Sequence, residues 1–458
     1  MRWHHLPIGL LLGAKALSVS AASQTTDDET GSLYEFVHNH RLATEVSYGP
    51  SGGIIGGESD LSFGLRYEPT LIWFVPQQEW SDRFFLSRFW LSHLEQDDTQ
   101  LGSAIPDPQG INDSNIEWRE FYWQENRLFG NPEWAMKLGR QRYQNRFGYW
   151  WDTSLESINF SFDDGTNNGL IALGQRFSNY TLEDTALEEN EKDIALLFAR
   201  YTWQWRQAQH LGFSLLHEQD YSGQQPREID GSDVSTTRLG LAAFGEADLA
   251  PTTAADYHIE AINLSGKRET ILASDVEKTE SQDGWLVLLE SGLRFQEWAG
   301  RPRLSLMGAL TNKPLTPEDG FYFNPIQSDR FSDEGYTDGL FSRFTRLNGR
   351  NFALASVKLE VSPFDRSQLS FKVASLQQRS ASGALPIQIA ADVVPDRNED
   401  HIGNFYQTSY VWDAFPRAVW GRQTELRAAL HLGYFEPGDA LPGLNGEFHA
   451  ATSINIVL

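Results

Sequence analysis

The feature that most constrains this chain is an alternation of apolar and polar side chains, repeated along most of its length. In the stretch SQLSFKVASLQ, Leu369, Phe371 and Val373 fall on one face of an extended chain, and polar residues fall on the other. The stretch RNFALASVKLEV at 350–361 alternates in the same way. A period of two is expected of strands that turn one face towards an apolar phase.

The same reading predicts strands over most of the chain, with aromatic residues such as Trp73 and Trp412 near many strand ends. Eighteen segments are predicted, near residues 40–48, 61–74, 82–94, 115–125, 133–142, 155–162, 168–177, 192–205, 209–218, 237–248, 254–264, 284–295, 302–310, 350–361, 367–378, 404–412, 424–435 and 447–457.

The connections between these segments alternate between short and long. Short ones include VPQQEWS, DDGTN and SPFDR, whereas long polar ones cover 95–114, 178–191, 219–236, 265–283, 311–349 and 379–403. A transmembrane antiparallel β-barrel has this plan, with short periplasmic turns and long extracellular loops. A closed sheet also satisfies every backbone N–H and C=O in lipid. A secreted soluble β-sandwich or propeller would not give long and short connections in turn. The sequence therefore predicts an all-β barrel of about 18 strands over residues 40–458.

The first residues have the pattern of a secretory signal. Arg2 precedes an apolar run from Leu6 to Val19, and small residues follow it. A membrane anchor would need about 20 apolar residues, and Lys15 interrupts this run. We therefore expect a signal peptide at 1–22, a short periplasmic segment at 23–39, and a location in the outer membrane of a Gram-negative bacterium.

Composition and motifs exclude several classes of function. A net charge of −25 opposes binding to nucleic acid, and the lack of cysteine excludes disulfides, thiolate metal sites and cysteine nucleophiles. The GPSGG sequence at 49–53 lies between two predicted strands, whereas a serine nucleophile elbow joins a strand to a helix. No zinc-protease, Walker or dinucleotide motif is present. The acidic runs lack the ordered ligand positions of a calcium loop. We expect neither a metal nor a cofactor.

Cations gather among aromatic residues in the stretch LGRQRYQNRFGYWWDTSLESINFSF at 138–162. We expect these cations to face the lumen or the adjacent outer loop, and the aromatic residues to mark the outer interface. A regular strand would, however, point Arg140 and Arg142 to the same side as Leu138. Either a bulge follows Leu138, or one arginine lies near the outer rim. For Arg140 the alternative to a lumen role is an ion pair with an acid of a neighbouring strand.

Four stretches together resemble the alginate-export porins of Gram-negative bacteria. They are EWREFYW at 117–123, KLGRQRYQNRFGYWWDTSLESINFSF at 137–162, LGQRFSNY at 173–180 and LHLGYFEPGDAL at 430–441. The resemblance is strongest over 117–220 and recurs over about 340–458. It implies a monomeric eighteen-stranded outer-membrane barrel that passes a polyuronate outward through an arginine-lined constriction.

The resemblance also implies a set of lumen residues. Its arginines correspond to Arg119, Arg142 and Arg346, and its acids correspond to Glu120, Asp152 and Glu183. Arg140 is a further candidate in the same stretch.

Two departures from the family pattern concern lumen arginines. Where the family has an arginine before the proline of the second strand, this chain has Glu68, and Arg66 lies two residues earlier on the same face. Ala429 and His431 occupy the positions of two arginines in the penultimate strand, where Arg427 keeps the same parity.

These observations predict a porin that conducts an anionic polysaccharide, alginate or a related polyuronate, in the export direction. Guanidinium groups bind carboxylates through charge-assisted hydrogen bonds, and several weak sites let a polymer move. Expected partners are the polysaccharide, outer-membrane lipid and lipopolysaccharide, and periplasmic proteins that deliver the polymer. The alternatives are a small-anion or oligosaccharide uptake porin, and a polysaccharide hydrolase or lyase that uses carboxylates such as Glu120 and Asp152.

Overall fold

The computed structural model describes most of the chain from Glu35 onward. The described residues are 35–50, 53–75, 82–96, 111–144, 150, 152–179, 181–182, 186–187, 192–222, 232–271, 277–316, 319–323, 340–345, 347–419 and 422–458. The predicted signal peptide, Glu183 and Arg346 lie outside these ranges.

Nearly all of the regular structure in the described residues is β-strand, and η4 (Leu128–Gly130) is a single 3-10 turn. The strands are β1 (Glu35–Pro50), β2 (Ser59–Phe74), β3 (Arg83–Gln96), β4 (Ile111–Glu125), β5 (Trp134–Gln144), β6 (Asp152–Asp163), β7 (Asn167–Gln175), β8 (Ile194–Arg206), β9 (Gln209–Asp220), β10 (Ser232–Ala250), β11 (Thr253–Ile271), β12 (Glu277–Ser281), β13 (Gly284–Phe295), β14 (Arg303–Thr311), β15 (Phe352–Val361), β16 (Ser367–Gln378), β17 (His401–Val419), β18 (Arg422–Pro437) and β19 (Glu447–Val457).

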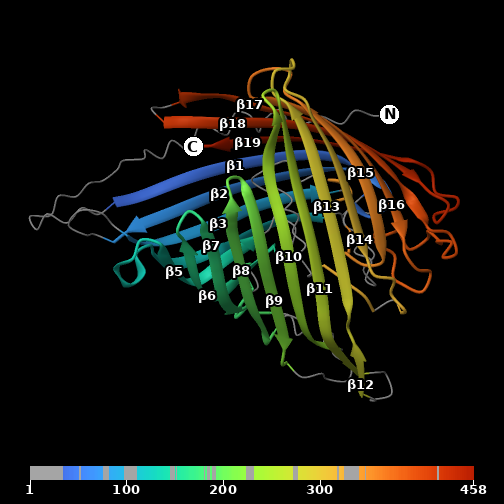
Figure 1. Cartoon of the computed structure of the whole chain (residues 1–458), viewed down its shortest axis with the longest axis horizontal. Coiled ribbons are helices and arrows are strands. Elements are labelled where there is room, and N and C mark those ends of the chain that lie inside the picture. The colour runs from blue at the N-terminus through green and yellow to red at the C-terminus, as the bar shows by residue number, and fades with distance from the viewer. Residues whose placement is uncertain are drawn as a thin grey trace, which may run out of the picture.

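The strands form one closed antiparallel sheet (Figure 1). Each strand pairs with its neighbours in sequence, and β1 closes the ring by pairing with both β2 and β19. The β12 and β13 strands both pair with β11, so the nineteen described strands fill eighteen positions. Each predicted segment coincides with one of these positions, which confirms the predicted barrel. The first strand begins at Glu35, before the predicted start at residue 40.

The two ends of the barrel differ in the length of their connections. Residues 207–208 join β8 to β9, and residues 251–252 join β10 to β11. The turn at 164–166 is closed by Asp164, whose carboxylate accepts hydrogen bonds from the backbone N–H groups of Thr166 and Asn167. A hydrogen bond from the Asn167 side chain, together with these two backbone bonds, lowers the pKa of Asp164 below its usual value. The start of β1 and the end of β19 lie at this short-turn end.

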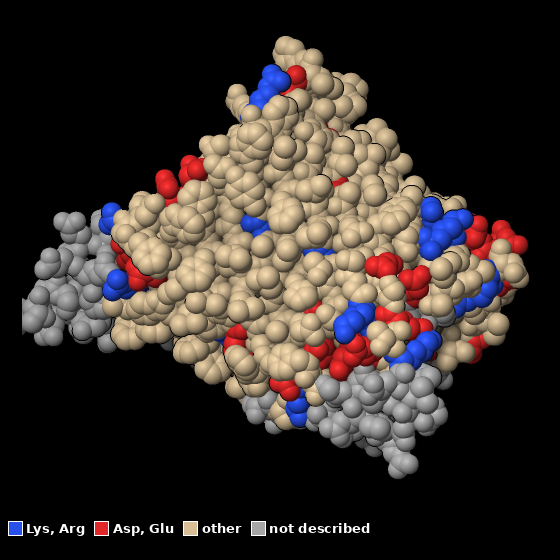
Figure 2. All heavy atoms as spheres, turned by 60° about the horizontal axis from the view of Figure 1, so that its bottom comes forward, with Lys and Arg blue, Asp and Glu red and all other residues tan. Residues whose placement is uncertain are grey.

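The outer face of the wall carries the apolar half of the alternation. In β13, Trp285, Val287 and Leu289 are exposed, whereas Leu286 and Leu288 are buried inside. Charged side chains lie mainly towards the edges of the face in Figure 2, and a broad area between them carries few charges. Within the described ranges, no helix has the length and apolar character needed to cross a membrane.

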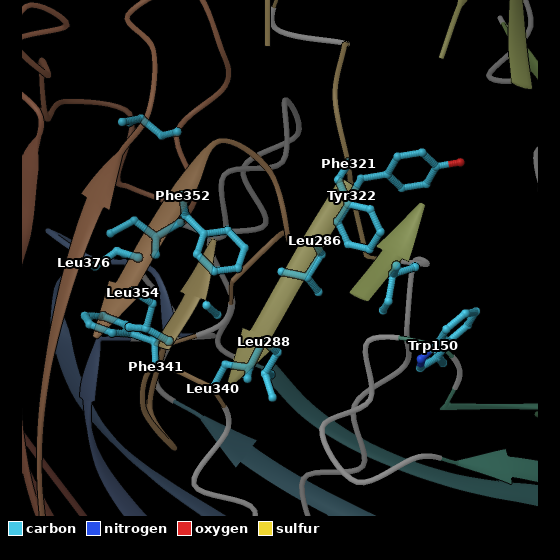
Figure 3. Packing of buried hydrophobic residues seen from close by; sticks show 14 of the residues in the cluster. Trp150, Leu286, Leu288, Phe321, Tyr322, Leu340, Phe341, Phe352, Leu354 and Leu376 are labelled. Carbon is cyan, nitrogen blue, oxygen red and sulfur yellow. The ribbon is translucent and has the colours of Figure 1, made fainter. Parts of the chain in front are cut away.

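Two parts of the long connection between β14 and β15, residues 319–323 and 340–345, lie inside the barrel rather than in a polar outer loop. Figure 3 shows Phe321, Tyr322 and Phe341 from this connection among wall residues such as Leu286 and Leu354. The rings of Phe321, Phe341, Phe352 and other residues form one buried apolar cluster. The sequence predicted a long polar loop here, but the connection also contains apolar residues, and burying them inside the barrel removes them from water.

The inner segment 319–323 approaches the wall at a glycine. A Cβ atom at Gly284 would lie 2.1 Å from the backbone nitrogen of Phe321, which is closer than a real side chain allows. Gln282 donates a hydrogen bond to the carbonyl of Gly320 at 2.9 Å, and the Phe321 N–H donates to Asn312 at 3.1 Å. The gap between β12 and β13 therefore holds the inner segment against β13.

We expect Gly284→Ala to displace the inner segment without preventing barrel formation. Overpacking of this kind lowers the free energy of unfolding by about 1–3 kcal/mol, and moving the segment should raise single-channel conductance. Urea unfolding in micelles and planar-bilayer recordings would measure the two effects. Gly308→Ala on the neighbouring β14 is the matched control, because its nearest contact would be at 3.8 Å. Equal conductance in both variants would contradict the prediction.

Candidate functional site

Three arginines from three strands converge on one indole ring. The guanidinium carbons of Arg66, Arg119 and Arg142 lie 3.9, 4.2 and 5.1 Å from the ring centre of Trp90. Arg66 belongs to β2, Trp90 to β3, Arg119 to β4 and Arg142 to β5, and the cluster lies on the inner side of the barrel. Arg66 and Arg119 are only 2% and 1% exposed, and Trp90 is 6% exposed. We call these four residues the Trp90 cluster.

A bulge in β4 brings Arg119 to the cluster. Arg88 pairs with Glu120 and Phe89 pairs with Trp118, so Arg119 is an extra residue with no partner opposite. A bulge of this kind re-aims a side chain that regular alternation would place on the other face. The neighbouring Glu120 also reaches the inside, where it forms an ion pair with Arg88 at 2.7 Å.

A break between β4 and β5 brings Arg142 to the cluster. The two strands pair only as far as Phe121 and Arg140. Gly139 has a φ of +127°, and a Cβ atom there would lie 2.3 Å from the carbonyl oxygen of Phe121. Beyond this point β5 stays in regular register with β6. The predicted irregularity after Leu138 is therefore present, but as a loss of pairing with β4 rather than as a register shift.

Arg140 does not join the Trp90 cluster. It forms an ion pair with Glu156 of β6 at 2.6 Å, and it donates further hydrogen bonds to the backbone carbonyls of Trp118, Ser178 and Asn179. It shares register parity with the exposed Leu138, yet it is buried because the segment after β7 covers it. The ion pair that was the alternative for Arg140 is the arrangement observed.

Carboxylates balance the charge of the cluster. The carboxylate of Glu68 forms one ion pair with Arg66 at 2.5 Å and another with Arg41 at 3.3 Å. Glu117 pairs with Arg119 at 3.2 Å. These acids hold the guanidinium groups in place, and they weaken the attraction that the arginines exert on a further anion.

Arg427 and His431 have partners of their own on β17. Arg427 pairs with Asp413 at 2.6 Å on neighbouring strands near the short-turn end. Asp152 begins β6 opposite Gln144. His431 is buried in the wall and hydrogen-bonded to Ser409 at 2.8 Å. Glu183 and Arg346 lie outside the described residues.

Sequence reasoning missed Trp90 and misplaced two other aromatic residues. Trp90 is one of the many aromatic residues near predicted strand ends, and its shared parity with Arg88 is the sequence signal for an inner position. Tyr143 and Trp150 were expected at the outer interface, and both are buried inside the barrel. The Tyr143 ring stacks on Phe198, and Trp150 donates a hydrogen bond to Glu260 at 2.7 Å. The inner position of Tyr143 agrees with regular alternation, because Tyr143 has the opposite parity to the exposed Leu138 and β5 stays in register with β6.

Among the described residues, no group of three or more histidine, aspartate and glutamate side chains is arranged to hold a metal ion.

The sequence profile described as "Alginate export" matches residues 92–449, which is most of the chain. The chain belongs to the alginate export family. It is 29% identical over 192 residues to the Alginate production protein AlgE of Pseudomonas aeruginosa, covering 40% of this chain and 39% of that protein. It is also 29% identical over 224 residues to the protein of the same name from Pseudomonas syringae, covering 45% of each. The matched stretches thus span less than half the length of these relatives.

Solved structures share the barrel with little sequence identity. OccK8 (OprE) of Pseudomonas aeruginosa is 8% identical with a TM-score of 0.57, and the match covers 92% of this chain and 98% of that one. OccAB2 of Acinetobacter baumannii is 9% identical with a TM-score of 0.55 and the same coverage. At such identities the likeness concerns the fold alone. Family and fold together place this porin barrel in the outer membrane of a Gram-negative bacterium.

Proposed function

We propose that this protein conducts an anionic polysaccharide, alginate or a related polyuronate, across the outer membrane in the export direction. The observation that carries the proposal is the convergence of Arg66, Arg119 and Arg142 on Trp90 inside a closed barrel. Membership of the alginate export family supports the substrate class. The direction, the monomeric state, contacts with lipopolysaccharide and delivery by periplasmic proteins are part of the same proposal, as is removal of residues 1–22 during secretion.

The chemistry of the cluster suits a polymer with one carboxylate on each sugar. A guanidinium group can donate two parallel hydrogen bonds to a carboxylate, and it stays charged at any physiological pH. Three such groups from different strands offer a carboxylate several alternative donors. Glu68 and Glu117 compete with the polymer for Arg66 and Arg119, so each contact would be weak. Weak contacts in series favour passage over retention.

Two rival functions make different use of the same residues. The small-anion or oligosaccharide uptake porin is favoured by Ala429 and His431, which replace two arginines of the family pattern. The hydrolase or lyase would need free carboxylates close to the substrate. Glu120 is engaged by Arg88, which opposes that use. We therefore propose conduction without cleavage.

The test is the reversal potential and polymer block of the refolded barrel in a planar bilayer, with polyuronate added to one side. We expect the wild type to be anion-selective and to be blocked by micromolar polyuronate, because the polymer competes for the arginines. Arg142→Glu should weaken the block at least tenfold, since it loses a charge-assisted bond worth about 1.5–3 kcal/mol and adds a repulsive charge. The product's chain length should stay constant.

A charge-matched control separates the lumen site from overall charge. Arg83 is partly exposed and pairs with Glu125 at the short-turn end, so Arg83→Glu changes the net charge equally without touching the cluster. Cation selectivity or indifference to polymer in the wild type would refute the polysaccharide conduit. Shortened polymer would identify an enzyme instead.

A further inference from the structure

A further buried arginine lies on β10, away from the strands of the Trp90 cluster, and its hydrogen-bond donors are unused. Arg238 of β10 is 1% exposed, and none of its three guanidinium nitrogens has a hydrogen-bond partner among the described residues. Its guanidinium carbon lies 4.6 Å from the ring centre of Tyr322. The guanidinium of Arg350 lies 5.1 Å from the same ring.

This arrangement differs from that of the other buried arginines in the wall. Arg303 is held by three carboxylates, those of Asp256, Glu290 and Glu360, at 2.5 to 3.2 Å. Arg66 and Arg119 also have carboxylate partners. No carboxylate of the described residues lies within ion-pairing distance of Arg238, although the buried carboxylate of Glu218 on β9 interacts with it at longer range. A charge at that range satisfies none of the hydrogen-bond donors of the guanidinium, and a buried charged group without hydrogen bonds is unfavourable, so the arrangement needs a closer partner.

The partner seen here is an aromatic ring delivered by the inner segment 319–323. Figure 3 shows Tyr322 beside Phe321 in this segment. The Tyr322 hydroxyl also lies 3.4 Å from that of Thr236, two residues before Arg238 on β10. A ring face attracts a cation, but it accepts none of the guanidinium's directional hydrogen bonds as an oxyanion would. Tyr322 is thus a weak substitute for an anion.

We propose that Arg238, with Arg350 beside it, is a second oxyanion-binding site that Tyr322 covers when no ligand is bound. The ligand class is a carboxylate or another oxyanion such as sulfate. Two guanidinium groups near one ring repel each other, and an anion bound to Arg238 would reduce that repulsion while accepting the hydrogen bonds of Arg238. The assignment of a uronate as ligand rests on the proposed function, whereas the anion site itself does not.

The experiment is isothermal titration of the full-length barrel in detergent micelles at constant ionic strength. One titration uses a mannuronate trisaccharide, and another uses sodium sulfate. We expect Arg238→Gln to weaken binding at least tenfold, and Arg238→Lys to weaken it less because the charge remains. Tyr322→Ala should strengthen binding several-fold, because the anion no longer competes with the ring. If Tyr322 were merely structural, its removal would leave binding unchanged or weaken it.

Arg83→Gln is the charge-matched control and should bind as the wild type does. Heat-modified migration on gels shows which variants fold. If Arg238→Gln does not fold, the affinities of Tyr322→Ala and Arg238→Lys still test the site. Equal affinities of the wild type and Arg238→Gln, binding of neither anion, or weaker binding by Tyr322→Ala would overturn the site. Sulfate binding that depends on Arg238, without trisaccharide binding or polymer block, would keep the site and refute the polysaccharide function.

Discussion

Replacing Glu68 by glutamine should both destabilise the barrel and make it more anion-selective. Glu68 is the shared carboxylate of two buried arginines, Arg41 and Arg66. Removing one partner of a buried ion pair leaves uncompensated charge and costs about 3 kcal/mol. The freed guanidinium groups should then attract mobile anions more strongly. The urea midpoint of unfolding in micelles and the reversal potential in a salt gradient would measure the two effects.

The matched control for Glu68→Gln is Glu269→Gln. Glu269 pairs with Lys267 on a solvent-exposed part of β11, and exposed ion pairs contribute about 0–1 kcal/mol. We expect little change in stability or selectivity from this control. If Glu68→Gln lost stability without a shift towards anions, the Arg66 end of the cluster would not face the conducting path.

Replacing Trp90 by alanine should have the second large effect. The indole is buried beneath three guanidinium groups, and removing a buried tryptophan costs about 3–5 kcal/mol through the lost burial and the cavity that remains. The arginines would also lose the ring face that holds them together. We expect a lower unfolding midpoint and a weaker polyuronate block, measured as the polymer concentration that halves the current.

Two further variants separate the role of the ring from general damage. Trp90→Phe keeps a ring face and should recover part of the polymer block and part of the stability. Trp203→Ala removes an outward-facing, exposed tryptophan of β8 and should leave the block unchanged. An unaltered block in Trp90→Ala would mean that the arginines do not need the ring to meet the polymer.

The positions of the strands could be predicted from the sequence because successive side chains of a strand alternate between its two faces, and this pattern is visible over a few residues. Leu286 and Leu288 lie inside while Trp285 and Val287 lie outside, as a period of two requires. The alternation of long and short connections then predicted the closed barrel. The motifs of residues 117–220 predicted the family and, with it, inner positions for Arg119 and Arg142.

The candidate site could be predicted only in part because its geometry depends on irregularities. Arg119 reaches the Trp90 cluster through a bulge, and Arg142 reaches it beyond the break at Gly139. Alternation fails at both points. Tyr143 lies inside as its parity requires, so its expected place at the outer interface followed from its residue type and not from alternation. Arg140, two residues from Arg142, is held by Glu156 instead.

Thus the sequence alone determined which residues form strands, which face each regular strand turns to the apolar phase, and the family to which the chain belongs. These properties are local, because backbone extension and burial are repeated at each pair of residues. The tertiary structure alone decided that three arginines share one tryptophan, and that Tyr322 covers Arg238. Those contacts join strands and an inner segment that are far apart in the chain, and no local period specifies such a meeting.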